Sequence, residues 1–330
     1  MTNVLVTGFM WALVAVLSLR ARTRPDNSVL WAAIAIATSF TTNIDSVYLT
    51  LTDIGPWPNG FDLAANILLM VGIYYLSRSI GRGATGLGSS GEFSERWIRI
   101  AVICAVTAMV IFFVLIDAPS ASTTFMLTYG NQLPAALYSI AQYTYIFVVM
   151  TGVLVTCIRN VPRMRHGRFK VGFSFLAIGC TSALGLCTAV IGMDIAHLAG
   201  NIGLMLGLGV LYNVLYAVTI GLLCIGLGIP PAGRLWHSLA RARKAQKIEP
   251  RIRRIWARTV AEQSSLSLVS GTASMEDSEP ERMARTIVRV HRMVVEIHDW
   301  VTFHKRSLSE RDRRTLAAAE ELCMQPGRRS

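Results

Sequence analysis

The chain has 330 residues, of which 52% are hydrophobic and 16% charged, and its net charge is +12. A soluble domain usually carries about 25% charged residues, so this composition excludes an ordinary water-soluble enzyme and indicates a chain that lies in lipid. The charge is uneven, because residues 1–233 hold 12 Lys or Arg and 8 Asp or Glu, whereas residues 234–330 hold 20 and 12. We therefore predict a membrane domain over residues 1–230 and a basic tail over residues 231–330.

Seven apolar segments approach the length that crosses a membrane, about 20 helical residues for a hydrocarbon core about 30 Å thick. We expect spans near residues 3–19, 29–50, 61–80, 99–117, 134–157, 171–193 and 204–228. The second half of 29–50 is polar and should face other helices. The predicted fold class is all-α: a polytopic membrane helical bundle of about seven transmembrane helices with a small cytoplasmic helical C-terminal region.

Basic residues alternate between the loops. The first, third and fifth connections carry 3, 4 and 5 Lys or Arg, whereas the connections near 51–60, 118–133 and 194–203 carry none. Lys and Arg are preferentially retained on the cytoplasmic side during insertion. We therefore expect a multi-pass plasma-membrane protein with its N-terminus outside and its C-terminus in the cytoplasm.

Acidic side chains of the membrane part gather at the predicted outer ends of the spans. An ionisable group inside a membrane costs at least about 2.5 to 3.5 kcal/mol on insertion scales, so it is a functional candidate. The candidate outward polar site, led by Asp45, comprises Asp45, Asp62, Asp194, His197 and Asn201. A structural interpretation stays open, in which Asp62 caps its helix, Asp194 ends another, and Asp45 hydrogen-bonds a neighbouring helix.

Neutral polar groups lie near the expected midplane, where no Lys, Arg, Asp or Glu occurs. They are Gln142, Asn213 and Tyr216, together with Tyr143. The lack of ionisable groups weighs against ion-coupled transport. Gly203 and Gly207 form a G-x-x-x-G pattern that favours close helix packing.

No catalytic or cofactor motif accompanies these groups. H-E-x-x-H and G-x-S-x-G are both missing from the sequence, so catalysis has no positive support. Asp194 and His197 stand three residues apart and supply only two metal ligands, fewer than a metal site needs. We therefore expect neither a cofactor nor a metal.

The tail begins with a basic segment that contains apolar residues and tryptophan. Such a segment gains roughly 1 kcal/mol per Lys or Arg close to an anionic membrane surface. We expect the lipid bilayer and its anionic inner-leaflet lipids to be partners, with contacts from Arg241, Arg243, Lys244 and Lys247. Nucleic acid is disfavoured because no recognised binding motif is present. Pro250 should interrupt this helix.

A loop near 264–280, rich in Ser, Gly, Thr and acidic residues, separates this segment from a helix that begins near Glu281. Apolar residues spaced alternately by four and three form an a/d seam on that helix. The seam comprises Ile287, Val290, Val294, Ile297 and Val301. It should pack within the tail, on a cytoplasmic protein partner, or on a second copy in a homodimer. A capping box at Ser309 and Asp312 predicts the start of the last helix.

Two tail stretches, Arg251 to Arg258 and Arg289 to Asp299, resemble an uncharacterised actinobacterial family of seven-helix membrane proteins. That family is often labelled as transporters and has a C-terminal cytoplasmic domain of unknown function. Its second stretch typically ends in Ile-Arg-Asp-Gly, whereas this chain has Ile297, His298, Asp299 and Trp300. The resemblance implies this architecture and a bacterial plasma membrane.

Two functions remain open from the sequence. The favoured one is a regulatory or receptor-like membrane protein that couples the outward polar site to the helical tail. The alternative is a transporter of a small molecule. The sequence does not separate transport from signalling.

Overall fold

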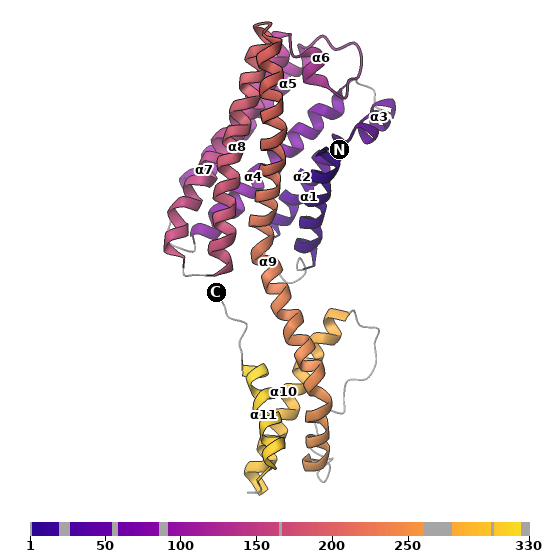
Figure 1. Ribbon diagram of the computed structural model, residues 1–330, viewed down its shortest axis with the longest axis vertical. Helices are drawn as coiled ribbons and strands as arrows, with labels where there is room; N and C mark the ends of the chain where they lie inside the picture. The colour runs from indigo at the N-terminus through magenta and orange to yellow at the C-terminus, as the bar shows by residue number, and fades with distance from the viewer. Residues whose placement is uncertain are drawn as a thin grey trace. The chain divides into compact units, whose positions relative to one another are not determined.

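The computed structural model describes residues 2–19, 27–54, 59–85, 92–164, 167–260, 279–304 and 307–324. Within these ranges the regular structure is entirely helical, so the fold is an all-α helical bundle (Figure 1). Contacts divide the chain into two compact units, Met1–Ala232 and Gly233–Ser330. This division falls inside one long helix.

The first unit contains most of the helices. They are α1 (Thr2–Ser18), α2 (Ser28–Thr42), α3 (Asp45–Ile54), α4 (Gly60–Thr85), α5 (Glu92–Val114), α6 (Phe125–Tyr129), α7 (Leu133–Asn160), the 3-10 helix η2 (Val161–Arg163), α8 (Arg168–Leu198) and the first part of α9 (Ile202–Val260). Among the described residues, 5 helices are long and apolar enough to cross a membrane: Gly60–Arg82, Arg96–Val114, Leu133–Arg163, Phe169–Leu198 and Ile202–Gly233. The chain is therefore a membrane-spanning helical protein.

Large apolar side chains are exposed along these spans. Ile103 and Val114 of α5 are 58% and 73% exposed, and Val210 of α9 is 68% exposed. Exposed apolar area costs about 25 cal/mol per Å² in water, whereas hydrocarbon removes that cost. The outer faces of α5 and α9 are thus suited to lipid.

The predicted bounds of the span over 29–50 are wrong, because α2 ends at Thr42 and a separate helix, α3, begins at Asp45. The hydroxyls of Thr41 and Thr42 donate to the carbonyls of Ala37 and Ser39, 2.7 Å away in each case. Such side-chain bonds compete with the helical ladder and favour an end. α1 and α2 are the shorter apolar helices, of 17 and 15 residues.

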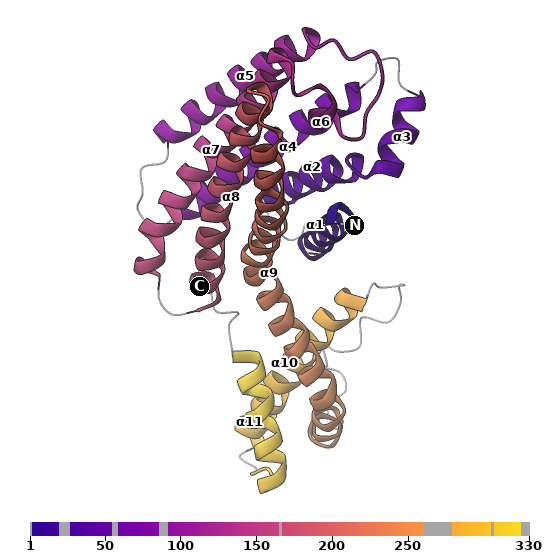
Figure 2. The same ribbon diagram turned by 45° about the horizontal axis from the view of Figure 1, so that its top comes forward.

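Helix α7 holds the first unit together. It packs against α4, α5 and α8, while α2 packs against α1 and α4; α7 runs beside α8 in both views (Figure 1, Figure 2). The buried core includes Met70 of α4, Val149 of α7 and Cys180 of α8. α7 can contact three partners because several of its faces carry apolar or small residues.

Close approach of α8 and α9 occurs at one glycine pair. A Cβ added to Gly226 would lie 2.9 Å from the carbonyl oxygen of Gly172, so only glycine fits there. Gly207, in contrast, has nothing within 4 Å, and Gly203 meets only the side chain of Asn201 at 3.8 Å. The packing expected for the G-x-x-x-G pattern is therefore not made within the described part of the chain.

The second unit is built from the last part of α9 with α10 (Glu279–His304) and α11 (Glu310–Met324). Its core joins all three helices through Ile252 and Ile255 of α9, Val290, Met293, Val294 and Ile297 of α10, and Leu316 and Ala319 of α11. The expected seam thus lies inside the tail, with Val301 half-buried at its edge. The side chain of Ile287 and most of the expected loop near 264–280 lie outside the described residues.

Polar pairs fix the direction of two of these helices. Arg289 of α10 bonds Glu249 of α9 at 3.2 Å, and the Trp256 indole donates to the Glu296 carboxylate. Residue numbers rise together along both helices, so α9 and α10 run parallel. The apolar seam and these edge contacts together set the register of the pair.

Pro250 does not interrupt α9, contrary to the expectation from the sequence. A proline inside a helix costs about 3 kcal/mol through its missing N–H and a steric clash. Ile252 and Ile255 follow directly and are 0% and 3% exposed. Burial of two such side chains contributes about 1.5–3 kcal/mol each and offsets the cost.

Gly226→Ala should lower the melting temperature of the purified protein. Its new methyl group would lie 2.8 Å from Leu176 Cγ and 2.9 Å from the Gly172 carbonyl oxygen, and overpacking costs about 1–3 kcal/mol. Gly221→Ala on the same helix is the matched control, because nothing lies within 4 Å of that position. Thermal unfolding in detergent measures both variants, and equal melting temperatures would contradict this packing.

Val290→Ala should loosen the second unit, whereas Val288→Ala should not. The two valines are 0% and 52% exposed, and removal of buried methyl groups costs roughly 1–3 kcal/mol. Hydrogen–deuterium exchange of the full chain reads out the tail directly. We expect faster exchange across α10 and α11 in Val290→Ala alone; equal exchange in both variants would remove Val290 from the core.

Candidate functional site

A chain of polar side chains joins α4 to α7 inside the first unit. Tyr138 OH donates to Asp62 Oδ2 at 3.0 Å, and Asn66 Nδ2 lies 3.0 Å from the same oxygen. Gln142 Nε2 then donates to Asn66 Oδ1 at 3.0 Å. Tyr138 and Gln142 are 1% and 3% exposed. Asp62 thus accepts one bond from α7, through Tyr138, and one from its own helix, through Asn66, in addition to any role at the start of α4.

Asn59 organises the loops at the same end of the bundle. Its side chain is fully buried and its φ of 60° lies in the left-handed region that Asn tolerates. Asn59 Oδ1 accepts bonds from Tyr48 OH and Ser122 N, both at 2.8 Å, while its Nδ2 donates to the Ser120 carbonyl at 2.9 Å. One amide therefore ties α3 and the segment after α5 to the beginning of α4.

A second polar cluster joins α7, α8 and α9. Asp194 of α8 is 6% exposed and faces the hydroxyl of Ser139 on α7. Its Oδ2 has no hydrogen-bond partner among the described residues. Tyr143, one helical turn after Ser139, lies within electrostatic reach of Asp194 and shares a hydrogen bond with Tyr212 of α9. A buried carboxylate with one free oxygen attracts a cation or a hydrogen-bond donor.

An apolar cavity of about 100 Å³ shares one residue, Tyr143, with this cluster. Its walls come from six helices: α1, α2, α4, α7, α8 and α9. Tyr143 and Tyr216 line it, and Tyr216 stacks on Tyr212 with ring centroids 5.7 Å apart and meets Phe40 edge-on at 5.9 Å. Aromatic faces of this kind attract cations as well as apolar groups. The cavity suits a small apolar body beside a polar head.

The two clusters lie on neighbouring faces of α7. Tyr138 and Gln142 are four residues apart and face α4, whereas Ser139 and Tyr143 face α8 and α9. Residues four apart share a helix face, and adjacent residues point in different directions. Asp62 and Asp194 are thus brought to the same end of α7 on different sides of it.

Other predicted site residues do not join these clusters. Asp45 is exposed at the start of α3. Asn201 caps α9, where its Oδ1 accepts from Leu204 N at 3.1 Å, and the amide of Asn213 donates to a carbonyl of its own helix at 3.0 Å. His197 packs against Gly130: a Cβ added to Gly130 would lie 2.9 Å from the Nδ1 atom of His197. Among the predicted acidic residues, Asp194 is thus buried in a polar cluster, whereas Asp45 is exposed.

Asn66, Tyr138 and Ser139 belong to the clusters but were not predicted from the sequence. A signal for two of them was present, because Asp62 and Asn66, and likewise Tyr138 and Gln142, are four residues apart in apolar segments. Polar pairs at that spacing share a face and favour a common partner helix. Ser139 had no such signal, since serine is common at helix–helix contacts.

The residues predicted to contact the inner leaflet all lie on α9 within the second unit. Arg243, Lys244 and Lys247 are exposed, and Arg241 is half-buried. Three of the four cations are therefore free to face an anionic surface.

The chain matches no family model, and no curated protein or solved structure matches it.

Asn66→Ala should destabilise the first unit. It removes bonds to Asp62, Tyr138 and Gln142 at once, and interhelical hydrogen bonds in membranes contribute about 0.6 to 1.7 kcal/mol each. Asn213→Ala is the control, because that amide bonds only within its own helix. Thermal unfolding in detergent should show a lower melting temperature for Asn66→Ala alone, and an equal loss in both would contradict the network.

Proposed function

We propose that this chain is a receptor-like or regulatory membrane protein that binds a small amphiphilic amine in the bundle and couples binding to the tail. The carrying observation is the buried carboxylate of Asp194, with one unpartnered oxygen, in a cluster that shares Tyr143 with the tyrosine-lined cavity. An ammonium group would neutralise the charge of the Asp194 carboxylate and donate a hydrogen bond to its unpartnered Oδ2. The apolar body of the ligand would fill the cavity.

The proposal includes an orientation and a number of spans. Basic residues of the odd-numbered connections favour an N-terminus outside the cell and a tail in the cytoplasm of a bacterium. α1, at 17 residues, is about 26 Å long, close to the hydrocarbon thickness. If α1 and α2 span as well, the bundle has seven transmembrane helices and the Asp194 cluster lies in its outer half.

Helix α9 supports the coupling. It supplies Tyr216, Thr219 and Ile220 to the cavity wall and Ile252 and Ile255 to the core of the second unit. A ligand that favours one arrangement of α9 in the bundle therefore acts on a helix that the tail also needs. A change in α9 would therefore alter the packing of the tail core, which contains Ile252 and Ile255.

Transport of a small molecule is the second candidate, because the cavity lies among the membrane-spanning helices. The resemblance to proteins labelled as transporters also favours transport. Neutral groups such as Gln142 would then contact the substrate. The small volume, about 100 Å³, supports a binding site more than a conduit.

Organic amines should stabilise the full chain in detergent, and Asp194→Asn should abolish that effect. A ligand at a hundredfold excess over its Kd stabilises by about 2.7 kcal/mol. Thermal unfolding with a panel of aliphatic and aromatic amines, and with the matched alcohols, measures it. Asp45→Asn is the control and should keep the response, because Asp45 is exposed.

Failure of every amine on the wild type, or equal loss in both variants, would contradict the proposed site. For a compound that binds, hydrogen–deuterium exchange of α10 and α11 separates the two functions. Altered exchange in the tail supports a receptor. Flux of the compound into proteoliposomes with unchanged tail exchange supports a transporter.

A further inference from the structure

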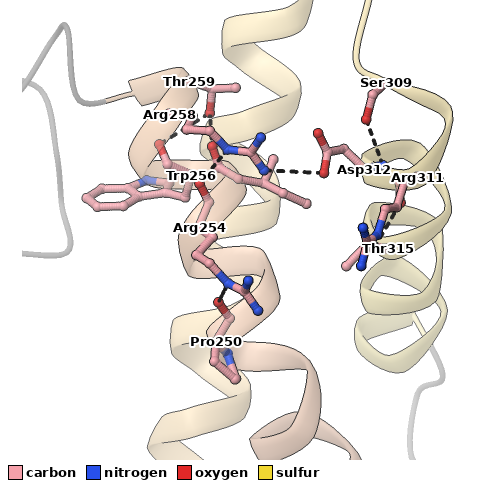
Figure 3. A network of polar contacts seen from close by, with 10 residues as sticks. Pro250, Arg254, Trp256, Arg258, Thr259, Ser309, Arg311, Asp312 and Thr315 are labelled. Carbon is pink, nitrogen blue, oxygen red and sulfur yellow. Dashed lines mark hydrogen bonds and ion pairs between the residues drawn. The ribbon is translucent and has the colours of Figure 1, made fainter.

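A cleft of about 530 Å³ lies between α9 and α11 in the second unit. α9 contributes Ile248 and Arg251, and α11 contributes Glu310, Arg311, Arg314, Thr315 and Ala318. Figure 3 shows the two helices side by side and antiparallel, with Arg258 reaching Asp312 across the gap. Binding pockets for small molecules usually measure about 300–1,000 Å³, so the cleft is large enough for one.

The charges that line the cleft do not cancel. Three arginines and one glutamate give a net charge of +2. Glu310 is paired with Arg314 on the same helix at 3.1 Å, and the nearby Asp312 is paired with Arg258 at 3.4 Å. Arg251 and Arg311 are exposed and have no carboxylate partner among the described residues. Two guanidinium groups from different helices therefore remain available.

The chemistry of these groups favours phosphate. A guanidinium presents a planar fork of donors that matches a phosphate group, and such charge-assisted bonds are about twice as strong as neutral ones. A phosphate monoester carries about −1.5 to −2 at neutral pH, close to the excess charge of the cleft. Ile248 and Ala318 add apolar surface for the rest of a ligand.

We propose that this cleft binds a phosphate-bearing anion, held between Arg251 of α9 and Arg311 of α11, with Arg314 at its side. The anion is either a soluble phosphorylated molecule or the headgroup of a phospholipid. This site does not depend on the amine site in the bundle. A ligand held by both helices stabilises the contact between α9 and α11.

Calorimetry on the full chain in uncharged detergent measures the binding of two probes. The first is inorganic pyrophosphate. The second is dihexanoyl phosphatidylglycerol, with dihexanoyl phosphatidylcholine as its zwitterionic reference. The double variant Arg251→Gln with Arg311→Gln should weaken binding by about tenfold or more, because charged hydrogen bonds are lost. The matched control is Arg253→Gln with Arg313→Gln. It removes the same charge from exposed arginines that do not line the cleft.

Pyrophosphate binding that is lost only in the cleft variant supports the site with a soluble ligand. Binding of phosphatidylglycerol alone, lost in the same variant, supports it with a lipid headgroup. Equal weakening in both double variants would show diffuse attraction to a basic surface and would overturn the proposal. No binding of either probe to the wild type would overturn it too.

Discussion

Buried polar groups in an apolar bundle have to find their partners inside the protein, because lipid offers no hydrogen bonds. Asp62 meets this constraint through Tyr138 and Asn66, which also brings α4 onto α7. Asp194 meets it only in part, since Oδ2 has no partner among the described residues. The two carboxylates thus have different roles. Asp62 makes a structural contact between helices, whereas Asp194 has one oxygen that can still accept a hydrogen bond.

Helices α7 and α9 have different tasks. α7 positions both polar clusters, because residues four apart on it face α4 on one side and α8 and α9 on the other. α9 belongs to both units and is continuous through Pro250. Its second part is held helical by the core of the tail, where Ile252 and Ile255 are buried. Loss of that core would leave the proline cost uncompensated.

Hydropathy and periodicity predicted the all-α bundle and seven spans, five of which correspond to the long apolar helices, because long apolar runs and an a/d seam are properties of the local sequence. Three expectations differ from the structure, the first for a local reason and the other two because of tertiary packing. The end of α2 at Thr42 depends on side-chain bonds to its own backbone. Pro250 stays helical because of its distant packing partners. Asp45 ranked above Asp194 because residue type and depth do not reveal which carboxylate another helix encloses.

The partners within the polar clusters also could not be predicted from the local sequence. Asn59 holds three groups from two other segments at 2.8–2.9 Å, yet in the sequence it is an ordinary turn residue next to a glycine. Its partners lie 11 to 63 positions away, so no local pattern specifies them.

Coupling between the two proposed sites is constrained by linkage. Tyr216 of α9 lines the cavity in the first unit, and Arg251 of the same helix lines the cleft in the second unit. If an anion at the cleft changes the affinity of the bundle for its ligand by some factor, that ligand changes the affinity for the anion by the same factor. A ligand with equal affinity for every arrangement of α9 shifts nothing, however tightly it binds. Regulation therefore requires that at least two arrangements of α9 differ in how they present Tyr216 or Arg251.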